Sequence, residues 1–198
     1  MTLALPPAPA PTRTRSQFVG TAFACAAGVM YFGGLLGTYA KMRHSAGGTS
    51  ATWLPKKVSI PEIPSNTMMI TMVLASITAQ WAVYAMRRGN RRDSSIAMAV
   101  TALFGVAVIN AQAFIYNQMK LPVRSADGKA FNVLFYTATG SMMFAIMVGL
   151  VLAAVTAFRS LGGRFSPTDT EGVSSTALYW HFLTVAFAAV WFFVYVTK

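Results

Sequence analysis

The sequence alternates long apolar runs with short polar connections. Five runs contain no Asp, Glu, Lys or Arg, and they cover residues 18–40, 66–86, 94–116, 131–158 and 174–197. A helix needs about 20 apolar residues to cross the hydrocarbon core of a bilayer, where it satisfies its own backbone hydrogen bonds. The pattern therefore predicts an all-α integral membrane protein, a bundle of five transmembrane helices within residues 18–198.

The segments outside the runs are polar and differ in kind. Residues 1–17 are rich in Pro, Ala and Thr, which predicts a disordered N-terminal segment. The first run is longer than the apolar part of a secretory signal, and no small-residue cleavage site follows it, so we expect it to remain as a helix. Residues 41–65 carry two Gly and three Pro, which predicts an irregular loop with a short interfacial piece around Trp53.

Composition supports the membrane assignment and limits the function classes. Hydrophobic residues make up 55% of the 198 residues and charged residues only 11%, which is unlike a soluble domain. The net charge of +11 would suit nucleic acid only if the basic residues gathered on one folded face, and they lie between the apolar runs instead. We therefore expect no nucleic-acid partner. The single cysteine, Cys25, excludes an intrachain disulfide.

The distribution of basic residues bears on orientation. Lys and Arg divide evenly between the two sides of a five-helix topology, but four arginines lie in one short turn, namely Arg87, Arg88, Arg91 and Arg92. Basic residues directly beside two membrane-spanning ends favour the cytoplasmic side. The sequence thus predicts a cytoplasmic N-terminus and an outside C-terminus.

Small residues repeat every four positions along the fourth run. They are Thr137, Ser141, Ala145, Gly149, Ala153 and Ala157. Small side chains let helix backbones approach closely, so such a stripe indicates a contact face. The contact is either packing within this chain or docking of a larger membrane partner.

His181 is the only ionisable residue with an imidazole, carboxylate, ammonium or guanidinium group inside the runs. Such residues are functional candidates because burying their charge in hydrocarbon is costly. A lone His is more often a hydrogen-bonded structural residue than a ligand. His44, the other histidine, falls in a connection, so the runs cannot supply two axial ligands to a heme or three ligands to copper.

Other polar residues of the runs, among them Gln80, Gln112 and Thr184, are expected to join helices through hydrogen bonds. The runs contain no Ser-His-Asp set, no paired carboxylates and no phosphate-binding glycine loop. We therefore expect no catalytic site, metal or redox cofactor in this chain.

The last run resembles the final helix of cytochrome c oxidase subunit III through Tyr179-Trp180-His181-Phe182. Upstream, the segment Phe135-Tyr136-Thr137-Ala138-Thr139-Gly140 is similar to the beginning of the family's preceding helix. Further similarities are Gln112 with Tyr116, Ser76-Ile77-Thr78 with Trp81-Ala82, and Met30-Tyr31-Phe32-Gly33-Gly34-Leu35, the last resembling the first helix of short five-helix bacterial forms. The order of these segments agrees with the family from about residue 18 to residue 198.

Several polar positions of the family differ in this sequence. Gly28 is the nearest match to a buried glutamate, Ile115 to an acid, Met142 and Ala145 to two histidines, and Thr184 to an aspartate. The resemblance associates these groups with bound phospholipid and with support of proton uptake by the catalytic subunit. Only His181 of this set is present. Fold and docking are therefore the properties we expect this chain to share with the family.

The resemblance implies a non-redox accessory subunit of a heme-copper terminal oxidase in a bacterial plasma membrane. Heme and copper would belong to partner subunits, and the partners would be the catalytic subunit, other membrane subunits and phospholipid. Candidate lipid or subunit contacts are His181, Tyr179, Trp180, Gln112, Tyr116, Ser141, Ala145, Gly149 and Ala153. Two alternatives are an accessory subunit of a nitric oxide reductase and an independent small channel or transporter, against which the lack of inverted repeats counts.

Overall fold

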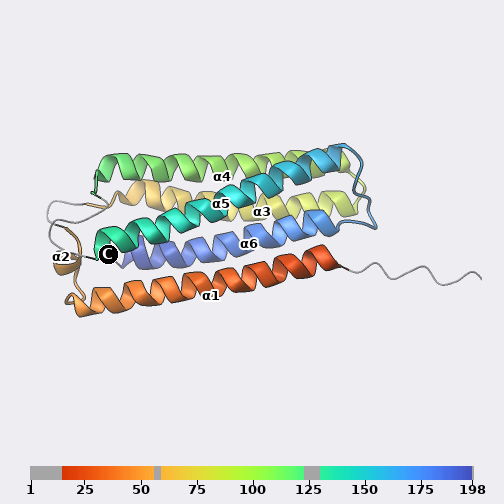
Figure 1. The fold of residues 1–198 in the computed structure, drawn as a ribbon. Coiled ribbons are helices and arrows are strands. Elements are labelled where there is room, and N and C mark those ends of the chain that lie inside the picture. Colours follow the sequence, from red (N-terminus) through yellow and green to blue (C-terminus); the bar gives the residue numbers. More distant parts are fainter. Residues whose placement is uncertain (1–14, 56–58, 123–129, 198) are drawn as a thin grey trace, which may run out of the picture.

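A computed structural model describes residues 15–55, 59–122 and 130–197, and its long helices lie side by side in one bundle (Figure 1). The elements are α1 (Ser16–Ser45), α2 (Ser50–Trp53), α3 (Glu62–Arg87), α4 (Arg91–Met119), α5 (Phe131–Leu161), α6 (Glu171–Val190) and the π-helix η1 (Trp191–Val196). Within the described ranges, five helices are long and apolar enough to cross a membrane, with η1 continuing α6. The prediction of a five-helix membrane bundle is confirmed. Most of the segment 1–17 predicted to be disordered, residues 1–14, lies outside the described residues.

The turn between α3 and α4 is formed by a glycine with positive φ and an asparagine that caps the next helix. Gly89 has a φ of +79°, a backbone conformation that residues with a side chain rarely adopt. The Asn90 side chain then accepts a hydrogen bond of 3.1 Å from the backbone N–H of Asp93, which caps the start of α4. A tight turn makes the two helices antiparallel neighbours and holds their flanking arginines at one end of the bundle.

The connection between α1 and α3 is anchored by an aromatic cluster. Trp53, at the end of α2, is only 2% exposed, and its indole N–H donates to the Tyr39 hydroxyl over 3.0 Å. Its ring also packs edge-on against Tyr39 and Phe131, at the start of α5. The short piece expected around Trp53 is therefore a helix whose tryptophan is buried against protein.

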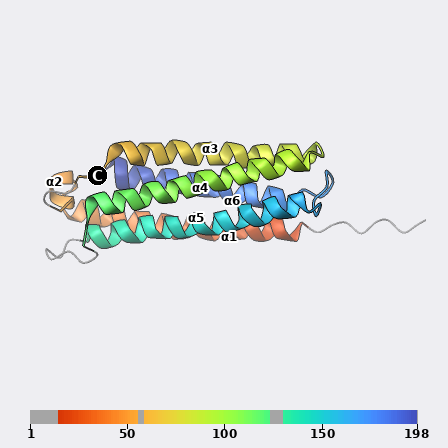
Figure 2. The same ribbon diagram turned by 90° about the horizontal axis from the view of Figure 1, so that it is seen from above.

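Helix α6 occupies the centre of the bundle. It contacts α1, α3 and α5, while α4 packs between α3 and α5 on the other side (Figures 1 and 2). Helix α1 lies outermost and packs mainly against α6, which leaves side chains such as Phe23 and Met30 more than 70% exposed. The core thus lies among α3, α4, α5 and α6, with α1 on the outside.

Close approach of α6 to α4 and α5 depends on one glycine in each of these two helices. A Cβ atom on Gly105 of α4 would lie 2.6 Å from Cη2 of Trp180 and 2.8 Å from Cδ2 of Leu150. A Cβ atom on Gly149 of α5 would lie 2.8 Å from Cδ1 of Leu183. These glycines form the hollow that receives Trp180, which has no exposed surface.

Gly105→Leu should therefore destabilise the bundle. The new side chain must displace the rigid Trp180 ring, and overpacking of this kind costs about 1–3 kcal/mol or more. The measurement is the thermal unfolding midpoint of the purified chain in detergent. Gly140→Leu is the matched control, since nothing lies within 4 Å of a Cβ atom there. Equal midpoints for the two variants would contradict the packing described.

Candidate functional site

His181 joins α6 to α3 through both ring nitrogens. Its Nδ1 lies 2.5 Å from the hydroxyl of Ser76, and its Nε2 lies 3.1 Å from the amide oxygen of Gln80. An amide oxygen only accepts, so Nε2 carries the proton and the Ser76 hydroxyl donates to Nδ1. A neutral imidazole satisfies both partners, and all three side chains are half-buried.

Thr184 extends this contact by one turn. Its hydroxyl lies 3.1 Å from the Met72 carbonyl of α3 and 3.0 Å from the Trp180 carbonyl of its own helix. We call Ser76, Gln80, His181 and Thr184 the α3–α6 polar seam. The hydrogen bonds of these residues join α3 to α6 at two successive turns.

The four residues of the Tyr179-Trp180-His181-Phe182 motif reach all four other long helices. The Tyr179 hydroxyl donates to the Ala145 carbonyl of α5 over 3.0 Å, and Trp180 fills the hollow at Gly105 of α4. His181 bonds to α3, and Phe182 packs directly on Gly28 of α1. Successive residues of a helix differ by about 100° in direction, which is why one turn can contact a full ring of neighbours.

Gln112 and Tyr116 take part in a second buried polar group, near the C-terminal end of α4. The Tyr195 hydroxyl of η1 donates to the Gln112 amide oxygen over 2.7 Å, and the Tyr116 hydroxyl lies 2.6 Å from the Thr139 hydroxyl of α5. Gln112 and Tyr195 are 1% and 4% exposed. The two residues of this sequence pair therefore connect α4 to different neighbours.

The small-residue stripe of α5 divides between two environments. Gly149 and Ala153 are buried within the chain, whereas Ser141 and Ala145 are half-buried beside α1. The Ser141 hydroxyl lies 2.7 Å from the hydroxyl of Tyr31. A groove of about 420 Å³ runs between α1 and α5 at this level, lined by Tyr31, Phe32, Gly140, Ser141, Phe144 and Ala145.

Sequence reasoning placed the polar residues in helices but did not pair them. Ser76 and Gln80 are four residues apart on one face of α3, and this spacing is the signal that could have identified them as partners of one side chain. Gly105 gave no such signal, because an isolated glycine in an apolar run does not indicate which helix it faces.

The residues described contain no group of three His, Cys, Asp or Glu side chains that could hold a metal ion. His44 lies at the end of α1, whereas His181 is in the middle of α6. The polar side chains of the interior can therefore donate and accept hydrogen bonds, and they offer no ligand set of the usual kinds.

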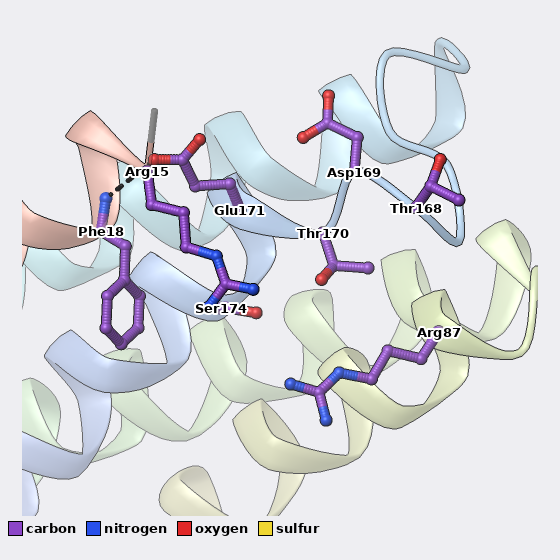
Figure 3. Close-up of a pocket in the computed structure, with 8 residues that line it drawn as sticks. All are labelled: Arg15, Phe18, Arg87, Thr168, Asp169, Thr170, Glu171 and Ser174. Atoms are coloured by element: carbon purple, nitrogen blue, oxygen red, sulfur yellow. Dashed lines mark hydrogen bonds between the residues drawn. The ribbon is translucent and has the colours of Figure 1, made fainter. Parts of the chain in front are cut away.

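A third polar feature lies at the end of the bundle where α1 and α6 begin. Glu171 accepts the backbone N–H groups of Gln17 and Phe18 over 2.7 and 3.1 Å, and these bonds satisfy two free donors at the start of α1. Figure 3 shows the bond from Phe18. Beside it is a pocket of about 340 Å³ toward which the Arg15 and Arg87 side chains extend (Figure 3). Among the residues described, no carboxylate forms an ion pair with either guanidinium.

Five other described arginines belong to segments at the same end of the bundle. Arg88 lies in the turn between α3 and α4, and Arg91 and Arg92 begin α4. Arg159 lies near the end of α5, and Arg164 lies in the loop that follows. Figure 1 shows the start of α1, the α3–α4 turn and the α5–α6 loop at the same end of the molecule. We call this surface the arginine end.

Fold and site together define a multi-helix membrane protein whose interior polar groups join its own helices. A family model described as Cytochrome c oxidase subunit III matches residues 18–198. This chain belongs to the cytochrome c oxidase subunit III family.

Individual relatives agree with this assignment. The cytochrome c oxidase subunit 3 of Prototheca wickerhamii is 35% identical over 150 residues, 74% of this chain and 54% of the relative. Proteins named probable cytochrome c oxidase subunit 3 are 25% identical in Mycobacterium bovis and 28% identical in Rickettsia felis. The aligned regions cover 89% of this chain and 86% of the former, and 90% of this chain and 67% of the latter. The chain thus spans about half the length of the first relative and most of the bacterial ones.

His181→Ala should destabilise the contact between α3 and α6. The substitution removes both hydrogen bonds and leaves the Ser76 hydroxyl and the Gln80 amide without their partner, a loss of about 1–3 kcal/mol. The measurement is again thermal unfolding in detergent. Thr137→Ala is the control, because the exposed Thr137 hydroxyl bonds only to the Val133 carbonyl of its own helix. If Thr137→Ala lowers the unfolding midpoint as much as His181→Ala does, the α3–α6 polar seam makes no specific contribution to stability.

Proposed function

We propose that this chain is a non-redox accessory subunit of a heme-copper terminal oxidase in a bacterial plasma membrane. The match to the family over residues 18–198 carries this proposal. The chain packs against the catalytic subunit, supports its assembly and stability, and holds phospholipid. Heme and copper belong to the partner subunits, which carry out the reduction of oxygen.

The use made of the interior polar groups supports an accessory role. The hydrogen bonds that join different helices of the chain include those of His181, the Gln112 amide oxygen and Tyr179. Where the family places ionisable groups, Gly28 packs on Phe182, and Ile115 and Met142 are fully buried. A proton path needs a series of groups that can exchange protons, and these positions supply packing instead.

The arginine end supports two parts of the proposal, the orientation of the chain in the membrane and the binding of phospholipid. The described residues of this end include seven arginines and three acids, Asp93, Asp169 and Glu171, so this end carries a net positive charge. A positive end favours the cytoplasmic side of the membrane, which gives a cytoplasmic N-terminus and an outside C-terminus. Guanidinium groups also bind phosphate through paired N–H donors, so Arg15 and Arg87 suit the headgroup of an anionic phospholipid.

The assembly proposal predicts co-purification. An affinity tag on this chain should recover a complex whose optical spectrum contains heme and whose subunits include a catalytic oxidase subunit by mass spectrometry. His181→Ala should weaken recovery of the complex without changing the heme spectrum, because the residue lies in helix packing and not at a redox centre. A chain that purifies alone, or with a nitric oxide reductase, would contradict the assignment.

The lipid proposal predicts a charge-dependent loss of bound lipid. Replacing Arg15 and Arg87 together by Gln should lower retention of anionic phospholipid about 10- to 30-fold, since each basic residue near the membrane surface contributes about 1 kcal/mol. Native mass spectrometry of the complex, after washing and addition of phosphatidylglycerol, measures the bound lipid. Lys120→Gln at the opposite end of the bundle is the control. Equal retention in the variant and the control would exclude this pocket as the headgroup site.

A further inference from the structure

The outward face of α4 carries a carboxamide at membrane depth. Asn110 is exposed, and it lies five residues from Gly105, the midpoint of the helix. At 1.5 Å per residue this is about 7 Å from the middle of the span, inside a hydrocarbon layer that extends about 15 Å each way. None of the described residues forms a hydrogen bond with its side chain.

Other exposed polar side chains of the spans solve this problem locally. Thr38, Thr67 and Thr137 each donate their hydroxyl proton to the carbonyl four residues earlier in their own helix. An asparagine has two donors and one acceptor, and it makes no such bond here. Hydrocarbon chains offer no partner, so at this depth only a polar group of a neighbouring molecule can satisfy the Asn110 carboxamide.

The residues around Asn110 form a regular ridge. Ala99, Leu103, Val106, Asn110, Ala113 and Asn117 are all exposed and alternate in spacing between four and three residues. The mean spacing is 3.6 residues, so the six positions lie along one continuous face of a straight helix. We call these six residues the α4 ridge. Its alanines permit close approach of a second helix, and a polar residue in such a ridge fixes the register of its partner.

We propose that a transmembrane helix of another oxidase subunit packs along the α4 ridge and hydrogen-bonds to the Asn110 carboxamide through a polar side chain. This inference rests on the proposed function and specifies the docking face. The ridge lies on the side of α4 turned away from α3 and α5, and α6 is on the opposite side of the bundle's core. The face is therefore free for a partner without any change in the packing of this chain.

Photo-crosslinking in the intact complex locates the partner. Benzoylphenylalanine replaces Leu103, which is 66% exposed on the ridge, and in a second variant Ile70, which is 64% exposed on α3. We expect the probe at position 103 to form an adduct with another subunit and the probe at position 70 to label lipid. Mass spectrometry of the adducts identifies the crosslinked chain.

Two substitutions of Asn110 test the hydrogen bond itself. Asn110→Leu should reduce retention of this chain in the complex during a detergent wash by about 3- to 30-fold. Asn110→Gln keeps the carboxamide and should retain most of the association. Both variants should fold, because the side chain is exposed, and the unfolding midpoint of the free chain checks this.

Each outcome has a distinct meaning. If the wild-type chain does not co-purify with any oxidase subunit, the proposed function fails and the inference fails with it. If the complex forms but the probe at position 103 labels only lipid, or a second copy of this chain, the proposed docking face is wrong while the function stands. Equal retention of Asn110→Leu and Asn110→Gln would show that the carboxamide has no partner.

Discussion

Helices inside a bilayer gain little from burying apolar surface, because lipid chains are as apolar as leucine. Association therefore depends on close packing and on hydrogen bonds, and in this chain both concentrate on one turn of α6. Tyr179, Trp180, His181 and Phe182 contact α5, α4, α3 and α1 respectively. The remaining helix pairs are neighbours partly because each of them is fixed to this turn.

The contacts of this turn and of the residue one turn later involve three positions that carry no ionisable group, Gly28, Ala145 and Thr184. Gly28 gives space to the Phe182 ring, the Ala145 carbonyl accepts from Tyr179, and the Thr184 hydroxyl bonds to α3. Each position does structural work with a small or apolar residue. These contacts need no ionisable side chain at the three positions, which agrees with the proposed role in assembly.

The sequence was sufficient to predict five membrane helices, because long charge-free runs have few other stable structures in lipid. It also singled out His181, since a lone imidazole in such a run is conspicuous. It could not pair His181 with Ser76 and Gln80, because the direction of a helix face is fixed by tertiary packing. The same limit applies to Gln112 and Tyr116, which are adjacent on α4 yet bond to Tyr195 of η1 and Thr139 of α5.

The packing of Gly28 on Phe182 joins α1 to α6, two helices that lie far apart in the sequence. During synthesis, α1 enters the bilayer long before the helix that receives it has been made. At about 5–20 residues per second, the ribosome needs about 8–30 s to complete the interval. Over that time most of the α1 surface has only lipid or an insertion factor to contact. The outermost helix is consequently made well before the helix that receives it, and a chain interrupted before α6 would leave α1 exposed to membrane proteases.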